Sequence, residues 1–283
     1  MQVVLNPRKL QLDWGNFGFL LVTHVGALAT LLWAIGPERS FAWQSWALAI
    51  SWLVLCNLSI VGMHRYYAHK SHKALLPVKI LYLLFGAGSF QGPAMRWASL
   101  HRDHHAFSDT HNDPYSVTRG FWWAHILWVI FKAGPKDSQV PIGDLQRDKL
   151  VLWQKRYYLP LAFFMGFVLP ALIALSWGDP WGGFLLAGLV RLTVQWHQTF
   201  CVNSVAHWFG EVVGGAGTAK NFGFWLGLLV ALLTFGEGAR HGRHHKKPRD
   251  YRIDPTWWGL DPGKWFIWTM SKIGFTSSLV RQD

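Results

Sequence analysis

Four apolar stretches constrain the fold of this chain most strongly, because each could cross a lipid bilayer as a single helix. A transmembrane helix needs about 17–25 predominantly apolar residues. The four stretches are Phe17–Ile35, Trp43–Gly62, Tyr158–Ser176 and Trp181–Phe200. Short links join the first to the second and the third to the fourth. The sequence therefore predicts an all-α integral membrane protein in which four transmembrane helices form two hairpins.

The composition supports this prediction. Hydrophobic residues make up 51% of the 283 residues, and charged residues make up 15%, against about 25% in an ordinary soluble domain. These values exclude a disordered, collagen-like or coiled-coil chain. Two further apolar runs, Leu75–Phe90 and Phe222–Phe235, are shorter and adjoin polar, histidine-rich sequence. We expect both to form interfacial or cap helices.

The basic residues predict the orientation in the membrane. Of the 27 Lys and Arg residues, 25 lie at the N-terminus, in residues 63–156 or in residues 204–283. Cytoplasmic segments next to membrane spans carry an excess of Lys and Arg. We therefore expect one domain over residues 1–283, with both termini and a cap formed by residues 63–157 and 204–283 in the cytoplasm. The net charge of +12 on so apolar a chain favours a membrane, and no nucleic acid, as partner.

Histidines are the main functional signal in the sequence. Of the 14 histidines, nine fall into three clusters, and His207 is a tenth candidate. The clusters are His64, His69 and His72; His101, His104 and His105; and His241, His244 and His245. The spacing His-x-x-His-His occurs twice and places three imidazoles on one helical face. A regular helix would hold His64 and His69 about 140° apart, so this pair predicts a helix end between them or two different metals.

The number and type of these side chains predict a pair of metal ions. Neutral imidazole suits Zn, Cu, Fe and Ni, and eight or more ligands exceed the three or four of a zinc site. Iron is favoured because oxygen chemistry needs a redox-active metal, which zinc is not. There is no His-Glu-x-x-His motif for a zinc protease and no Glu-x-x-His pair of a soluble di-iron bundle. Cys56 and Cys201 form no Cys-x-x-Cys pair, so a thiolate site is not expected.

The remaining histidines fit less specific roles. His24, His125 and His197 stand alone in apolar sequence and are expected to be core or interfacial residues. His72 and His111 lie near clusters but outside the repeated spacing, and ligation is the less favoured role for both. The many tryptophans are typical of anchors at the membrane interface.

Four motifs make the chain resemble membrane fatty acyl desaturases of the stearoyl-CoA desaturase type. They are HRYYAH at 64–69, HRDHHAFSDTHNDPYSVTRGF at 101–121, VNSVAH at 202–207 and HGRHH at 241–245. They occur in the family's order and near its spacing, and the resemblance covers residues 64–274. It implies a four-span bundle beneath a cytosolic cap, with the acyl chain in a kinked tunnel below two irons.

The resemblance also implies roles for single residues. Asn203 corresponds to an asparagine that holds one iron through a water, and Gln91, Trp97 and Thr199 correspond to residues that contact the substrate or line the tunnel. The implied iron ligands are His64, His69, His101, His104, His105, His207, His241, His244 and His245.

Two departures from the family pattern bear on the site and the substrate. The third histidine motif follows Gly236-Glu237-Gly238 by way of Ala239-Arg240, one residue longer than usual and without the usual aromatic residue. Ser99 and Leu100 replace an Arg-Asp pair that contacts coenzyme A in the mammalian-type enzymes. The sequence thus leaves acyl-CoA, acyl-lipid and acyl-carrier-protein substrates open.

The expected activity is dioxygen-dependent insertion of a cis double bond, with the delta-9 position favoured, into a long fatty acyl chain. Electrons must come from an external carrier, such as a b-type cytochrome or a ferredoxin, because the chain has no haem motif or iron–sulfur cysteine set. Hydroxylation, terminal-alkene formation and decarbonylation on the same scaffold remain alternatives. A non-catalytic haem or metal carrier is less favoured, because haem would need axial histidines within facing spans.

Overall fold

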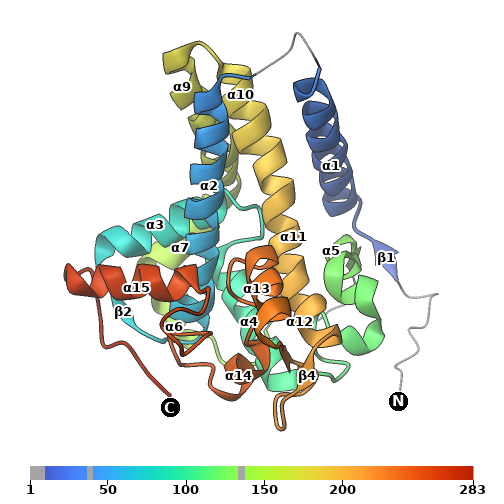
Figure 1. Cartoon of the computed structure of the whole chain (residues 1–283), viewed down its shortest axis with the longest axis vertical. Coiled ribbons are helices and arrows are strands. Elements are labelled where there is room, and N and C mark those ends of the chain that lie inside the picture. The colour runs from blue at the N-terminus through green and yellow to red at the C-terminus, as the bar shows by residue number, and fades with distance from the viewer. Residues whose placement is uncertain (1–9, 37–40, 133–137, 283) are drawn as a thin grey trace.

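The fold separates long helices from a layer of shorter ones. A computed structural model of the chain describes residues 10–36, 41–132 and 138–282. The long helices run along the longest axis of the molecule, and the shorter helices and strands gather at one end of them (Figure 1). The described residues thus form a predominantly helical structure, and we call the layer of shorter elements the cap.

Three helices among the described residues are long and apolar enough to cross a membrane, and they correspond to the first three predicted spans. The first is α1, and the second is α2 with its continuation η2. The third runs through α8, η5, α9 and η6. Their bounds are α1 (Trp14–Ala34), α2 (Trp43–Val61), η2 (Gly62–Ala68), α8 (Tyr158–Phe163), η5 (Phe164–Val168), α9 (Leu169–Ala174) and η6 (Leu175–Trp177).

The fourth predicted span is also helical, but its composition is less apolar. It is formed by α10 (Pro180–Phe184), η7 (Leu185–Val190) and α11 (Arg191–Asn203). The Arg191 side chain is buried within it and donates hydrogen bonds to the carbonyl oxygens of Ala187, Gly88 and Gly166 at 2.8–3.0 Å. Such bonds satisfy a buried guanidinium. This helix remains a predicted span.

Asp179 ties the two hairpins together at the end of the bundle away from the cap. One carboxylate oxygen caps α10 by accepting a hydrogen bond of 2.8 Å from the Gly182 amide. The other accepts hydrogen bonds from the Ala42 amide at 3.0 Å and from Ser45 Oγ at 2.7 Å. One side chain therefore fixes the start of α2 against the start of α10.

The cap consists of short helices and three small antiparallel strand pairs. Its helices are α3 (Leu76–Ala87), α4 (Ala94–Phe107), η3 (Val117–Arg119), η4 (Trp123–Leu127), α5 (Trp128–Ile130), α6 (Gly143–Arg147), α7 (Lys149–Arg156), α12 (Val205–Trp208), α13 (Phe224–Leu233), α14 (His241–Lys246) and α15 (Pro262–Lys272). The paired strands are β1 (Gln11–Leu12) with β3 (Phe131–Lys132), β2 (Lys73–Ala74) with β6 (Thr276–Ser277), and β4 (Glu211–Val212) with β5 (Lys220–Asn221). The two short apolar runs of the sequence are the helices α3 and α13, both too short to span a bilayer.

Close packing of α2 and η2 against α3 positions the end of the second predicted span that carries the first histidine motif. Gly62 lies against the ring of Tyr82, and a Cβ at this position would overlap that ring. Met63 and Tyr82 are both completely buried in the largest apolar cluster of the cap. The segment that carries His64 is therefore held rigidly by the packing of its neighbours.

Candidate metal centre

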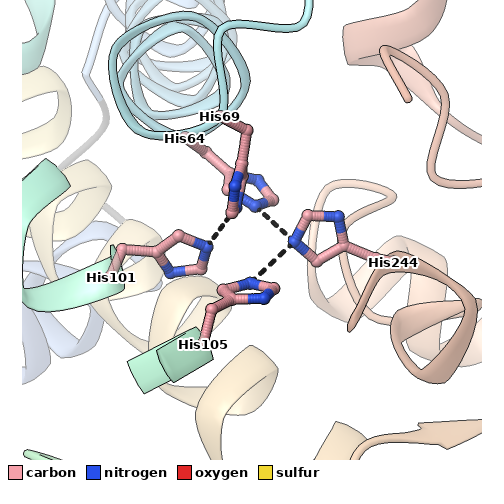
Figure 2. Close-up of side chains that lie close together, drawn as sticks. All are labelled: His64, His69, His101, His105 and His244. Carbon is pink, nitrogen blue, oxygen red and sulfur yellow. Dashed lines mark hydrogen bonds between the residues drawn. The ribbon is translucent and has the colours of Figure 1, made fainter. Parts of the chain in front are cut away.

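Five histidines from three segments form the first group of candidate metal ligands. They are His64, His69, His101, His105 and His244, and one ring nitrogen of each lies within 4.8 Å of one ring nitrogen of every other. Figure 2 shows the five rings pointing toward a common centre from η2, from α4 and from the α14 region. Here we name this group cluster 1.

Cluster 1 contains both histidines of the first motif because the helix changes type at this point. Residues Gly62–Ala68 form a π-helix, and the His69 amide donates to the His64 carbonyl oxygen at 3.1 Å. This i to i+5 bond brings two side chains five positions apart onto one face. His64 and His69 therefore lie in the same cluster. The sequence analysis had offered two different metals as one of two alternatives for this pair. Single π-turns within helices occur frequently at functional sites.

Four further histidines form a second group, named cluster 2. They are His104, His207, His241 and His245, and their ring nitrogens also lie within 4.8 Å of one another. His104 and His105 are neighbours on α4, and His244 and His245 are neighbours on α14, so each of these helices supplies both clusters. The His-x-x-His-His spacing thus serves two adjacent sites from one helix.

The two clusters adjoin through one stacked pair of rings. His105 of cluster 1 and His245 of cluster 2 have ring centroids 4.2 Å apart and an interplanar angle of 21°. These two are also the least buried members of their clusters, since all the others are buried. The clusters therefore form one continuous centre with a half-buried edge.

In each cluster, one imidazole contacts a buried carboxylate, Glu237 in cluster 1 and Asp113 in cluster 2. Glu237 Oε2 lies 2.6 Å from His64 Nδ1, and Asp113 Oδ1 lies 2.9 Å from His104 Nδ1. An ionised carboxylate only accepts hydrogen bonds, so each Nδ1 carries the proton and each Nε2 presents its lone pair to the cluster. Carboxylates commonly orient metal-binding histidines in this way.

Glu237 is itself held in a buried ionic network. Arg65 Nη2 donates to Glu237 Oε1 at 2.6 Å and to Asp261 Oδ1 at 2.7 Å. Although burial by itself raises the pKa of Glu237, Arg65 and His64 lower this pKa to about 2. Glu237 is therefore a carboxylate throughout the physiological pH range.

Burial favours the neutral, metal-binding form of several of these imidazoles. Burial is the largest cause that lowers the pKa of His101, His105 and His244 well below the usual value, and the neighbouring imidazoles lower it further. His207 and His245 of cluster 2 are affected in the same direction for the same reasons. Only neutral imidazole offers a lone pair to a cation.

The distances between ring nitrogens test whether these residues fit metal ions. The Nε2 atom of His244 lies 2.8 Å from Nε2 of His64 and 3.1 Å from Nε2 of His105. One shared proton cannot satisfy several converging lone pairs, whereas a cation at their centre can. In cluster 2, the buried His207 Nε2 has no hydrogen-bond partner among the described residues. Both observations fit two metal ions with imidazole ligands.

Three residues with a predicted substrate role form one hydrogen-bonded chain beside cluster 1. Gln91 Nε2 donates to Thr199 Oγ1 at 2.9 Å, and Trp97 Nε1 donates to Gln91 Oε1 at 3.1 Å. The Trp97 ring also stacks on His101 with centroids 5.3 Å apart. Asn203 is half-buried at the end of α11, four residues before His207. The predicted roles of these four residues stay predictions.

The other histidines lie outside both clusters. His24, His197 and His125 form a chain in which successive ring nitrogens are 3.1 and 3.0 Å apart, and His125 Nδ1 lies 2.9 Å from Ser204 Oγ. His72 is buried beside Ser71 and Tyr82, and His111 is exposed. The sequence analysis predicted no contact among His24, His125 and His197, because these residues are far apart along the chain.

The lengthened third motif still delivers its first histidine to the centre. His241 begins α14, and its Nε2 atom lies 3.2 Å from Nε2 of His245. The additional residue falls before the helix, where Arg240 is partly exposed. Sequence reasoning missed the contacts of Glu237 and Asp113, although both residues stand in motifs that the sequence analysis recognised. Acidic residues next to histidine motifs were the available signal.

Comparison with known proteins gives a consistent relationship. A family model described as fatty acid desaturase matches residues 41–265. The chain is 33% identical to a stearoyl-CoA desaturase of Homo sapiens over 273 residues, which cover 94% of this chain and 74% of that protein. It is 39% identical to a probable acyl-CoA desaturase of Schizosaccharomyces pombe and 37% identical to acyl-CoA desaturase 1 of Saccharomyces cerevisiae, over 82% and 77% of this chain. The chain spans about half the length of these two yeast relatives, 48% and 42% respectively.

Proposed function

Because this chain belongs to the fatty acid desaturase family, we propose that it inserts a cis double bond, at the delta-9 position, into a long fatty acyl chain. The observation that carries the proposal is the convergence of nine histidines into two adjacent clusters. The names of the relatives, acyl-CoA and stearoyl-CoA desaturases, support acyl-CoA as the substrate.

We propose iron as the metal of both clusters, with all nine histidines as ligands and Asn203 acting through a water. Iron fits a set of neutral nitrogen donors, and the reaction needs a redox-active metal. Two irons bound there would supply the dioxygen chemistry that removes hydrogen from an unactivated methylene.

The side chains around the clusters have separate tasks in this reaction. Glu237 and Asp113 keep the Nδ1 protons on His64 and His104, so that the Nε2 lone pairs stay directed inward. Buried apolar neighbours exclude water, which protects a reactive oxidant from side reactions. Trp97, linked through Gln91 to Thr199 and stacked on His101, is placed to fix the acyl chain against cluster 1. Such fixation selects the carbon that reacts.

The same family relationship supports the membrane arrangement predicted from the sequence. We propose that α10, η7 and α11 form a fourth span, so that residues 1–283 are one domain with four crossings. The cap and both termini then lie on the cytoplasmic side, as the distribution of Lys and Arg favours. Electrons come from a separate carrier, since the sequence contains two cysteines and no haem motif.

Expression in a host that lacks delta-9 monoenes tests the proposed function. Gas chromatography with mass spectrometry, after derivatisation that locates double bonds, should show a new delta-9 cis monoene in total fatty acids. Cells that express the His105→Ala variant at the same level should lack this product, because His105 belongs to cluster 1 and contacts cluster 2.

Other products would point away from desaturation. A hydroxy acid would assign the chain to hydroxylation on the same scaffold, an alkane shortened by one carbon to decarbonylation, and a terminal alkene to terminal-alkene formation. Unchanged fatty acids from cells with a verified electron donor and a metal-loaded protein would contradict the proposal itself.

A further inference from the structure

The proposed reaction requires that two electrons per turnover reach the centre from outside the chain. One turnover converts –CH2–CH2– and O2, with two electrons and two protons, into –CH=CH– and two molecules of water. Carbon is oxidised by two electrons and dioxygen is reduced by four, so two electrons must be delivered by a reductant. Because the chain contains only Cys56 and Cys201 as thiols and no haem motif, the reductant is a separate one-electron carrier. A docking site for this carrier follows only if the chain has the proposed function.

The third histidine motif is embedded in a concentrated basic segment. Residues 240–252 contain six Lys and Arg residues and a single acidic residue, Asp250. Asp250 is 1% exposed and pairs with Arg243 at 2.6 Å and Arg252 at 3.0 Å. The side chains of Lys246 and Arg249 are exposed. The charge that this segment presents to the outside is therefore positive.

This basic segment lies where a water-soluble protein could reach it. In Figure 1, α14 is at the lower end of the molecule, opposite the tips of α9 and α10. By contrast, the exposed residues Lys155 and Arg156 end α7 and are separated by one residue from α8, which begins a predicted span. Lys155 and Arg156 therefore adjoin a predicted span, whereas Lys246 and Arg249 lie in and just after α14, which adjoins no predicted span along the chain.

The segment is also directly adjacent to a histidine of the centre. Lys246 directly follows His245 in α14, and His245 belongs to cluster 2. The His245 ring stacks on His105 of cluster 1 at 4.2 Å. These two rings are the half-buried edge of an otherwise buried centre. A carrier seated on α14 would thus contact the residue next to the edge that joins the clusters.

We propose that the surface formed by Lys246, Lys247 and Arg249 is the docking site of an acidic one-electron carrier protein. Complementary charge brings such partners together quickly and orients them. Transient electron-transfer complexes are small, so a surface with two exposed basic residues and the partly buried Lys247 is sufficient. The electrons enter at His245 and reach both clusters through the His105–His245 stack.

The test measures carrier binding and turnover with purified protein in phospholipid vesicles. Two acidic carriers serve as probes: the haem domain of a b-type cytochrome and a plant-type [2Fe–2S] ferredoxin. In the double variant Lys246→Glu/Arg249→Glu, the Kd and apparent KM for the productive carrier should rise at least roughly ten-fold at low salt. The steep salt dependence of the wild type should disappear. The KM for acyl-CoA and turnover at saturating carrier should stay unchanged.

A matched control separates local charge from total charge. The double variant Lys155→Glu/Arg156→Glu carries the same charge change at the membrane boundary and should bind the carrier as the wild type does. Arg249→Glu alone, three residues beyond α14, should show a smaller rise in the carrier KM. Bound metal should be equal in all variants, which verifies that His244 and His245 are undisturbed.

Several outcomes would overturn the proposal. An unchanged carrier Kd in the α14 variant would do so, as would wild-type protein that binds neither carrier. A raised KM for acyl-CoA with normal carrier binding would assign the surface to the phosphates of the substrate. Failure of the proposed function is separate: protein reduced by dithionite and then exposed to oxygen would form no unsaturated product, whatever its affinity for the carrier.

Discussion

Replacing His241 with alanine is expected to abolish desaturation, even though the motif that contains His241 departs from the family pattern. The structure places His241 in cluster 2, with its Nε2 atom 3.2 Å from that of His245. Loss of one ligand from a four-histidine cluster should remove one metal ion of the pair. Turnover should fall at least about a thousand-fold, which corresponds to a barrier higher by about 4 kcal/mol.

The measurement combines product analysis with metal analysis of the purified variant. His111→Ala is the matched control, because His111 is exposed and lies outside both clusters, and it should keep full metal content and activity. A His241→Ala protein with both metals and more than a tenth of the wild-type turnover would remove His241 from the site.

Replacing Glu237 with glutamine is expected to weaken the centre without removing any of its histidines. Glu237 accepts from both His64 Nδ1 and Arg65 Nη2 at 2.6 Å. An amide has one acceptor oxygen, so its NH2 group must face one of these two donors. The result is an unpaired buried charge or a displaced His64 ring. Loss of such an outer partner typically lowers metal affinity or activity about 10–100-fold.

Metal titration and thermal unfolding distinguish the two consequences of Glu237→Gln. Breaking a buried ion pair costs about 3–5 kcal/mol, so the unfolding temperature should fall as well. Glu211→Gln is the control, because Glu211 is exposed in β4 and should change neither quantity. Wild-type metal affinity in Glu237→Gln would show that the orientation of His64 does not depend on the carboxylate.

Apolar length predicted the first three spans of the bundle, for a physical reason. Crossing a bilayer requires long uninterrupted apolar helices, and such helices can be recognised in a single sequence as long apolar runs. The first three predicted spans are helices of sufficient length and apolarity. The fourth stretch contains Arg191, whose partners are carbonyl oxygens of residues up to 103 positions away. Sequence alone cannot show how such a charge is satisfied.

The sequence predicted which family the chain belongs to, but not how its histidines are divided between the two clusters. The family membership inferred from the histidine motifs is confirmed by the comparisons. The assignment of each histidine to one of two clusters was not predictable, because it depends on the π-turn between Gly62 and Ala68 and on how α4 meets α14. The contact between His64 and Glu237 joins residues 173 positions apart. Only the folded chain reveals such partners.

The most direct test of this account is the number and identity of metal ions bound per chain. Protein purified anaerobically from iron-replete cells, without added chelator, would be analysed by inductively coupled plasma mass spectrometry against quantitative amino-acid analysis. The account predicts two irons per chain in the wild type and fewer than two in His241→Ala. Wild-type protein that holds no more than one metal ion per chain, or two zinc ions while it desaturates, would contradict the proposed di-iron centre.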